Sequence, residues 1–257
     1  MAELKQSDVW TQLRRWTPAR IGLGRVGGSL PTEALLDFEL AHAQARDAVH
    51  ASFDADALAE KVCATGFGDV AIVRSQARDR MEYLLRPDLG RALDAASQTR
   101  LAEMSKSESK LAVVIADGLS ALAPERHAIP LLTELHASQG FENVTVVIAN
   151  QARVALGDAI GEILRAPLVL VLIGERPGLS SPDSLGAYLT WAPRVGRTDA
   201  ERNCISNIRP QGLSYAEAAH RLRYLLDQAR RLQLSGIGLK DDSEESPQLL
   251  PSCESPR

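Results

Sequence analysis

The chain has 257 residues, of which 45% are hydrophobic and 24% are charged, and its formal net charge is −4. Such a chain can build a substantial core, either as one large domain or as a principal domain with an extension. The small negative charge argues against the strong basic field with which proteins grasp a phosphate backbone. We therefore expect a folded, soluble protein that does not bind nucleic acid.

The three cysteines, Cys63, Cys204 and Cys253, are widely separated and form no Cys-x-x-Cys pair. This pattern argues against a disulfide framework or a zinc cluster and fits a reducing cytoplasm. The first residues have no apolar core of signal-peptide length, and no segment reaches the apolar length of a membrane helix. We expect a cytoplasmic protein without a membrane segment.

Residues 1–66 are predicted to form a helical and glycine-loop N-terminal segment. Three apolar residues at helical spacing precede Pro18, namely Trp10, Leu13 and Trp16. A glycine-rich loop then leads into a helical pattern, for which Pro31 and Glu33 suit the first turn. Its apolar residues recur on one face, at Leu36, Leu40 and Ala43.

Four short runs rich in Val, Leu and Ile predict strands buried on both faces, at Val70–Val73, Leu111–Ala116, Val144–Ala149 and Leu168–Ile173. Helical patterns lie between them: one opened by Arg86-Pro87-Asp88 and running to about Met104, then Pro130–Ser138 and Leu156–Leu164. Helices between strands predict right-handed parallel crossovers. We expect residues 67–239 to form a Rossmann-like, doubly wound α/β domain with layers around a mostly parallel sheet.

Two further runs, Ala187–Trp191 and Cys204–Ile208, are candidates for additional strands. Ser214 and Glu217 have the spacing of a helix capping box, and Gly236 suits the end of that helix. Its predicted buried face is Leu222, Leu225, Leu226, Ala229 and Leu232. Residues 240–257 are charged and rich in Ser and Pro, so they are predicted to form a disordered acidic tail.

Gly22, Gly24 and Gly27 complete the pattern G-x-G-x-x-G. In a dinucleotide site these glycines would bring backbone N–H groups close to a pyrophosphate, but the fingerprint needs a strand before it. No convincing strand pattern precedes these glycines. A structural loop or partner contact is therefore favoured over the site of a stand-alone nucleotide-dependent oxidoreductase.

Asp117 and Gly118 directly follow the predicted strand Leu111–Ala116. Polar residues at the carboxyl end of a buried strand are candidates for ligand binding. An aspartate in this position can equally cap the next element while the glycine forms a tight turn. The residues alone leave both interpretations open.

Further candidates flank the next two predicted strands. Arg153 and Val154 precede a helix, and Glu175 follows Leu168–Ile173 in the sequence GERPG. Glu175 could accept hydrogen bonds from ligand amides, although an ion pair for Glu175 and core packing for Val154 are the commoner roles. For Cys204, burial or ligand packing is preferred to covalent catalysis, and the five histidines lack the spacing of a metal site.

Several long blocks, in order, resemble the small subunit of ethanolamine ammonia-lyase from about Trp10 to Lys240. They include TPARIGLGRVGGSLPT, YLLRPDLGR, VVIADGLSA, ARVALGDAIGEIL, VLIGERPGLSSPDS and RNCISNIRPQGLS. The resemblance implies an adenosylcobalamin-dependent lyase that converts ethanolamine into acetaldehyde and ammonia. It also implies that the glycine loop is a structural or subunit-contact segment rather than a nucleotide site.

The resemblance further implies a hetero-oligomer in which the large subunit binds ethanolamine and the small subunit completes the cobalamin site. By motif, Val154, Glu175 and Cys204 are the expected cobalamin contacts, with Arg153 as a neighbour. The sequence lacks the Asp-x-His-x-x-Gly motif, so cobalamin is expected to keep its own lower base. The complex is expected in the free cytoplasm or in a bacterial microcompartment, and a non-catalytic scaffold subunit remains an alternative.

Overall fold

A computed structural model describes residues 8–67, 70–104, 109–136 and 143–243. Within these ranges a six-stranded sheet has the order β1-β3-β2-β4-β5-β6. The strands are β1 (Val70–Arg74), β2 (Leu111–Ala116), β3 (Val144–Asn150), β4 (Leu168–Gly174), β5 (Leu185–Trp191) and β6 (Arg202–Ile208). The first four pair in parallel, whereas β5 is antiparallel to both β4 and β6. The predicted α/β fold with a mostly parallel sheet is confirmed, as are all six strands.

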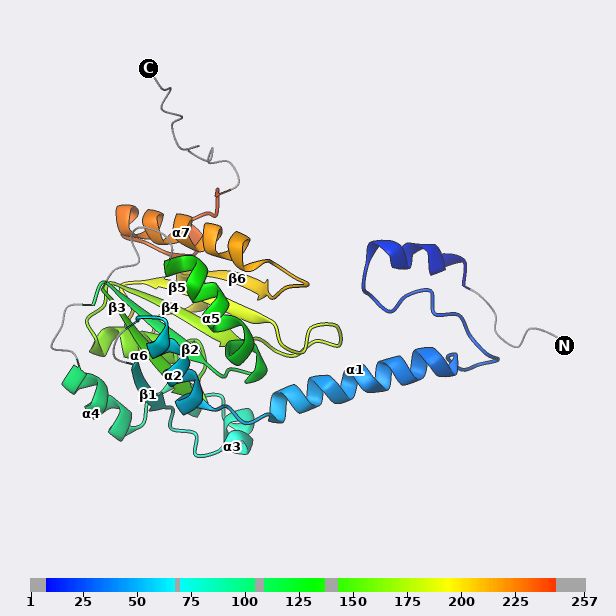
Figure 1. Ribbon diagram of the computed structural model, residues 1–257, viewed down its shortest axis with the longest axis horizontal. Coiled ribbons are helices and arrows are strands. Elements are labelled where there is room, and N and C mark those ends of the chain that lie inside the picture. The colour runs from blue at the N-terminus through cyan, green and yellow to red at the C-terminus, as the bar shows by residue number, and fades with distance from the viewer. Residues whose placement is uncertain (1–7, 68–69, 105–108, 137–142, 244–257) are drawn as a thin grey trace, which may run out of the picture.

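Helices cover the two faces of the sheet unequally (Figure 1). On one face, α2 (Ala55–Ala64), α5 (Leu122–His136) and α7 (Tyr215–Leu232) together reach from β1 to β6. On the other face, α4 (Ala95–Met104) and α6 (Leu156–Ile163) pack over β1, β2 and β4. The side chains of β2 and β4 are buried throughout, because helices cover both of their faces.

The predicted capping box of α7 is confirmed. The Glu217 N–H donates to Ser214 Oγ at 3.3 Å, and the Ser214 N–H donates to Glu217 Oε2 at 3.1 Å. The apolar face of the helix is buried up to Ala229, but Leu232 is exposed. The helix ends at Gln233 in a left-handed conformation, and Gly236 instead opens a short 3-10 turn, η4 (Gly236–Gly238).

Two helix boundaries differ from the prediction. Instead of one helix opened by Arg86-Pro87-Asp88, a short helix α3 (Arg80–Leu85) comes first, then a 3-10 turn η2 (Leu89–Arg91), and α4 begins only at Ala95. Proline disfavours helical geometry in the residue before it, so α3 stops ahead of Pro87. Helix α5 begins at Leu122 and contains Pro130, which therefore does not mark its start, and its predicted end at Ser138 lies outside the described residues.

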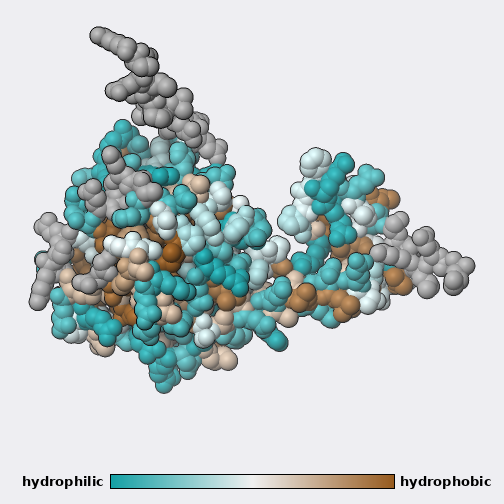
Figure 2. All heavy atoms as spheres, in the orientation of Figure 1, coloured by the Kyte–Doolittle hydropathy of each residue, from teal (hydrophilic) through white to brown (hydrophobic). Residues whose placement is uncertain are grey.

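Residues 8–50, here called the arm, project away from the sheet (Figure 1). The arm contains a 3-10 helix, η1 (Val9–Trp16), the glycine loop and the long helix α1 (Thr32–His50). The predicted apolar face of α1 does not pack on the sheet, because Leu36 and Leu40 are 58% and 60% exposed. Figure 2 shows hydrophobic residues along this helix. Helix α2 precedes residue 66 in the chain but packs in the main core. The predicted division into residues 1–66 and 67–239 stays a prediction.

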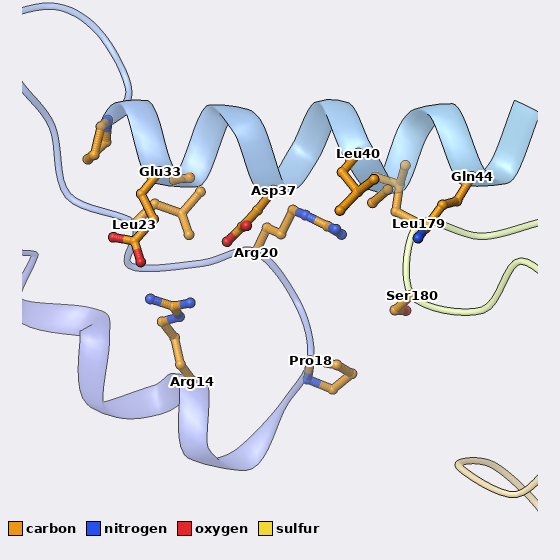
Figure 3. Close-up of a pocket in the computed structure, with 13 residues that line it drawn as sticks. Arg14, Pro18, Arg20, Leu23, Glu33, Asp37, Leu40, Gln44, Leu179 and Ser180 are labelled. Carbon is orange, nitrogen blue, oxygen red and sulfur yellow. The ribbon is translucent and has the colours of Figure 1, made fainter.

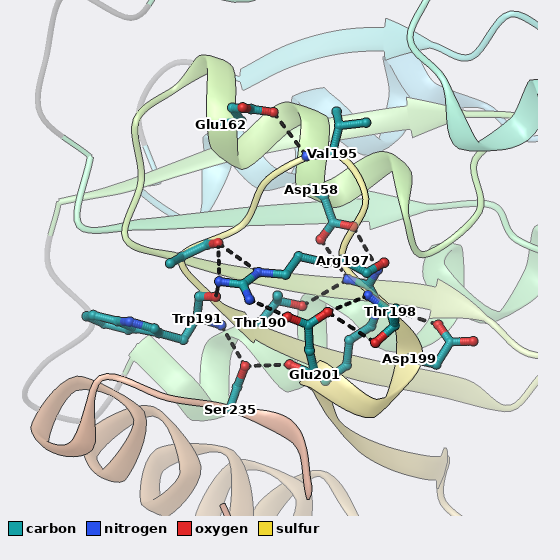
Figure 4. A network of polar contacts seen from close by, with 12 residues as sticks. Asp158, Glu162, Thr190, Trp191, Val195, Arg197, Thr198, Asp199, Glu201 and Ser235 are labelled. Carbon is teal, nitrogen blue, oxygen red and sulfur yellow. Dashed lines mark hydrogen bonds and ion pairs between the residues drawn. The ribbon is translucent and has the colours of Figure 1, made fainter. Parts of the chain in front are cut away.

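A buried ion pair joins α6 to the start of β6 (Figure 4). Arg202 donates to both carboxylate oxygens of Asp158, at 2.6 and 2.7 Å, and both side chains are almost fully buried. Its remaining donors reach Thr190 Oγ1 at 3.2 Å and the Arg197 carbonyl at 2.9 Å. Burial raises the pKa of Asp158, and the Arg202 guanidinium opposes that rise. The pair anchors the start of β6 to α6, the nearest helix on this face of the sheet.

Replacing Arg202 with Met should lower the free energy of unfolding by about 3 to 5 kcal/mol, because it leaves the Asp158 carboxylate buried without its cation. The matched control is Asp199→Asn, which removes a 96% exposed partner of the same arginine and should cost less than about 1 kcal/mol. Urea unfolding of the full chain measures both changes. Equal losses for the two variants would contradict the role given to the buried pair.

Candidate functional site

A cavity of about 730 Å³ lies at the carboxyl edge of the parallel strands. It is here called the cleft. Arg153 and Val154, which follow β3, and Glu175, which follows β4, all line the cleft. The structure therefore brings three of the predicted site residues together from segments that are separate in the sequence. This agrees with the general position of ligand sites in open α/β sheets.

Two glycines let the backbone close tightly at the floor of the cleft. A Cβ on Gly118 would lie 2.2 Å from the Gly174 carbonyl oxygen, and a Cβ on Gly174 would lie 2.0 Å from the Ser120 carbonyl oxygen. Gly118 also has a φ of +55°, which other residues rarely adopt. The Leu119 N–H donates to the Gly174 carbonyl at 2.9 Å. The turn after β2 is thus locked onto the end of β4.

Asp117 is 2% exposed and binds a neighbouring loop, whereas Gly118 forms the tight turn predicted for it. Its carboxylate accepts hydrogen bonds from the backbone N–H groups of Gln151 and Ala152, at 3.1 and 3.0 Å. Arg80 lies 3.3 Å from the same carboxylate. Burial raises the pKa of Asp117 to about 6, while these donors partly oppose the rise. Asp117 therefore holds the loop that carries Arg153 and Val154.

Tyr83 forms part of the cleft wall between two arginines. The guanidinium of Arg80 lies 5.0 Å from the centroid of its ring, and that of Arg153 lies 4.3 Å from it. The Tyr83 hydroxyl donates to the Ala152 carbonyl at 2.9 Å, and burial raises the pKa of this tyrosine. Within the described part of the chain, the buried Nε of Arg153 has no acceptor. The sequence reasoning missed Tyr83 and Arg80.

Glu175 is held by backbone groups of its neighbours. Its Oε2 accepts a hydrogen bond from the Asn207 N–H at 3.1 Å, and its own N–H donates to the Ser184 carbonyl at 3.0 Å. A Cβ on Gly186 would lie 3.1 Å from Glu175 Oε1, so the glycine leaves room for the carboxylate. No cation among the described residues forms an ion pair with it. The carboxylate is oriented and keeps acceptor capacity toward the cleft.

Cys204 lies beside the cleft rather than on its wall. It is exposed on β6, directly opposite Tyr188 of β5, whose ring lines the cleft. Its sulfur lies 3.4 Å from Ser206 Oγ. Cys204 and Ser206 lie two residues apart, on the same face of β6, and both are exposed. The sequence reasoning also missed Tyr188, since an aromatic residue inside a strand carries no signal of a site.

The glycine loop packs on η1. Thr11 Oγ1 donates to the Gly22 carbonyl at 3.0 Å, and a Cβ on Gly22 would lie 2.7 Å from the Thr11 nitrogen. Residues 17–24 contain no strand, so the loop lacks the setting of a dinucleotide fingerprint. These observations agree with the structural alternative.

A second cavity, of about 430 Å³, lies between the arm and the loop after β4. Figure 3 shows Arg14 and Arg20 on the side of α1 that carries Glu33 and Asp37. Leu179 and Ser180 line this cavity from the sheet side. Pro18 and Ser180 line both cavities, so the arm reaches the rim of the cleft.

Over the described ranges, no group of three His, Cys, Asp or Glu residues is arranged to hold a metal ion. None of the helices in those ranges is both long enough and apolar enough to cross a bilayer.

The pKa of Asp117 predicts a pH-dependent effect of replacing it with Asn. The folded chain holds the Asp117 proton up to about pH 6, above the ordinary carboxyl pKa of 3.8, so its stabilising contribution is lost as the pH rises through 6. Asn does not titrate. The difference in free energy of unfolding between the wild-type chain and Asp117→Asn should therefore shrink by about 2 to 3 kcal/mol between about pH 4 and pH 7. Urea unfolding across that range measures the difference, and a constant value would refute the assignment.

Comparisons with known proteins identify the family. Residues 7–240 match the family model of the ethanolamine ammonia-lyase light chain (EutC). The chain is 57% identical to the ethanolamine ammonia-lyase small subunit of Pseudomonas aeruginosa strain LESB58 over 95% of this chain and 91% of that protein. It is 56% identical to the small subunit of Azotobacter vinelandii over 92% of this chain and 90% of that protein. The resemblance seen in the sequence blocks is confirmed: the chain belongs to the ethanolamine ammonia-lyase light chain family, the small subunits of a carbon–nitrogen lyase.

Proposed function

We propose that this chain completes an adenosylcobalamin site at its interface with the large subunit of an ethanolamine ammonia-lyase. The reaction is the conversion of ethanolamine into acetaldehyde and ammonia. The observation that carries the proposal is that Arg153, Val154 and Glu175 line one cleft at the carboxyl edge of the parallel strands of a mostly parallel sheet. This is the position at which open α/β sheets bind cofactors.

The cleft has the size of a small-molecule site and a lining that suits one side of a corrin. Its volume lies within the range of ligand pockets, and its lining mixes apolar side chains with a few polar groups. The corrin rim carries neutral amide groups, which need both acceptors and donors. The Glu175 carboxylate supplies an acceptor, the Arg153 side chain lines the cleft with a cationic group, and Val154 offers an apolar contact. Cys204 is exposed on β6 next to the cleft residue Tyr188, so it extends the surface that the cofactor can contact.

Adenosylcobalamin, when bound, supplies the radical chemistry that the side chains of a protein cannot. The residues of this chain then have three tasks: to bind the cofactor, to orient it and to exclude water from one side of it. The geometry favours these tasks, because Asp117, Gly118 and Gly174 fix the backbone around the cleft. A rigid wall positions a bound group at little cost in conformational entropy.

The arm is the proposed docking segment for the large subunit. Apolar side chains of the arm that are at least 40% exposed include Val9, Trp10, Leu13, Trp16, Leu30, Leu35, Leu36, Phe38 and Leu40. An exposed apolar surface of this extent marks a protein interface. Charged residues in the second cavity, such as Arg14 and Asp37, would supply polar contacts at its margin. The large subunit is proposed to bind ethanolamine, and the location of the complex, in the cytoplasm or in a microcompartment, stays a prediction.

The proposed function is tested on the chain expressed together with its large subunit. The purified complex should release acetaldehyde only when both adenosylcobalamin and ethanolamine are present, and the isolated chain should release none. Titration of the isolated chain with NAD and NADP tests the oxidoreductase alternative and should give no saturable heat. A well-folded complex without the lyase activity would overturn the proposal.

In that complex, Glu175→Ala should weaken adenosylcobalamin binding by about 1 to 3 kcal/mol, because a ligand amide loses its acceptor. Glu175→Gln keeps an acceptor oxygen and should lose less. The matched control is Glu103→Ala, since Glu103 is exposed on α4 and does not line the cleft. Equilibrium dialysis measures the three affinities. Unchanged affinity in Glu175→Ala would favour a scaffold subunit that does not touch the cofactor.

Trp10→Ser combined with Trp16→Ser should weaken binding to the large subunit by at least about 10-fold, because exposed tryptophans are typical of the residues that dominate interface energies. These residues are 61% and 76% exposed, so the fold and its thermal unfolding should not change. Ile237→Ser, at a site that is 85% exposed on η4, is the control. Sedimentation of the mixed subunits measures association. If the double tryptophan variant binds the large subunit as tightly as the control variant does, the arm is not the docking segment.

A further inference from the structure

The cleft carries a local charge opposite to that of the whole chain. The charged side chains on its wall are three arginines, Arg153, Arg176 and Arg209, and one acid, Glu175. The chain as a whole has a formal net charge of −4. A concave site lined by one sign of charge concentrates its field and attracts a ligand of the opposite sign. The cleft therefore suits a ligand that is partly anionic.

The sheet brings two of these arginines to the same edge. Arg176 follows β4 by way of Glu175, and Arg209 directly follows β6. Leu185 of β5 pairs with Gly174 at the end of β4 and with Ile208 at the end of β6. The two arginines are therefore separated by the width of a single strand, β5, on the rim of the cleft.

Arg209 is held in place by neutral groups. Its Nε donates to Asn207 Oδ1 at 2.8 Å, and its Nη1 donates to the Ser180 carbonyl at 3.2 Å. Its backbone is fixed as well, since the Arg209 N–H donates to the Leu213 carbonyl at 3.1 Å and the Gly212 N–H donates to the Arg209 carbonyl at 3.0 Å. The Arg209 guanidinium is thus oriented by neutral neighbours at the exposed rim of the cleft, without being neutralised.

Neither Arg176 nor Arg209 forms an ion pair with a carboxylate of the described residues. Other arginines near the sheet do: Arg126 pairs with Asp183, and Arg202 pairs with Asp158. A charged donor that is already oriented binds a ligand at a smaller entropic cost than a freely moving one. Arg209, held by neutral groups and without an acid partner, is therefore arranged to receive an anion that arrives with the ligand.

We propose that Arg209, assisted by Arg176, binds the phosphodiester group in the nucleotide tail of cobalamin. The inference rests on the proposed function and assigns it a further subsite. The corrin amides are neutral, and the phosphodiester is the anionic group of the molecule. When cobalamin keeps its own lower base, this tail folds beneath the ring and stays close to the residues that hold the corrin. The planar arginine fork is suited to two phosphate oxygens.

The test compares two corrinoids on the complex of both subunits: cyanocobalamin, and cyanocobinamide, which lacks the phosphodiester, ribose and lower base. Arg209→Gln should weaken cyanocobalamin binding by about 10- to 100-fold, as expected for a lost charge-assisted hydrogen bond, and should leave cyanocobinamide binding unchanged. The control is Arg194→Gln, because Arg194 is exposed beyond the end of β5 at the opposite edge of the sheet. Equilibrium dialysis at low and high salt measures each affinity.

The phosphodiester contact is also expected to make cyanocobalamin binding by the wild-type complex sensitive to salt, and Arg209→Gln should reduce this sensitivity. Equal weakening of both corrinoids by Arg209→Gln, or no weakening of either, would overturn the inference and leave the proposed function standing. A wild-type complex that binds neither corrinoid would instead overturn the proposed function. If Arg209→Gln separates the subunits without changing the selectivity for cyanocobalamin, the arginine pairs with the large subunit and the inference is wrong.

Discussion

The buried carboxylate of Asp117 organises the carboxyl edge of the sheet. It accepts hydrogen bonds from the backbone N–H groups of Gln151 and Ala152, and these residues immediately precede the cleft residues Arg153 and Val154. Arg80 joins the same carboxylate to the arm, because its Nε donates to the Val49 carbonyl in the last turn of α1 at 2.7 Å. One buried polar network therefore connects the base of the arm to the wall of the cleft.

The unequal covering of the sheet explains why the molecule suits an assembly. Helices α2, α5 and α7 span one face, whereas on the other face α4 and α6 pack mainly over β1, β2 and β4. Asp158 of α6 reaches the start of β6 through Arg202, but Cys204 and Ser206 farther along β6 are exposed. The open strand surface, the cleft and the apolar arm are three unsatisfied surfaces on one chain. Each is a surface that a second subunit or a cofactor can bury, and an exposed apolar surface such as that of the arm is typical of an interaction site.

Features that depend on a few neighbouring residues could be predicted from the sequence, whereas features that depend on contacts between distant segments could not. The apolar runs that form the strands, and the Ser214–Glu217 capping box, act within a few residues, so they were predictable. Val154 and Glu175 could be found because they follow strands. Arg80 and Tyr83 could not, since they lie on the six-residue helix α3, which is too short to show a helical period. Leu36 and Leu40 form a true apolar face, but the sequence does not say whether the sheet or another chain covers such a face.

The ionisable groups of the described core serve structural roles, and this supports the proposed division of labour between the subunits. Asp158 is bound by Arg202, and Asp117 by backbone N–H groups and Arg80. His127 Nδ1 lies 2.8 Å from the Tyr215 hydroxyl, and burial lowers the pKa of this histidine. A general acid or base needs a proton that can be exchanged with a substrate, and these groups are occupied by hydrogen bonds and ion pairs with neighbouring protein groups. What the chain offers at the cleft is shape, oriented donors and positive charge, which are the properties needed to hold a cofactor rather than to move a proton.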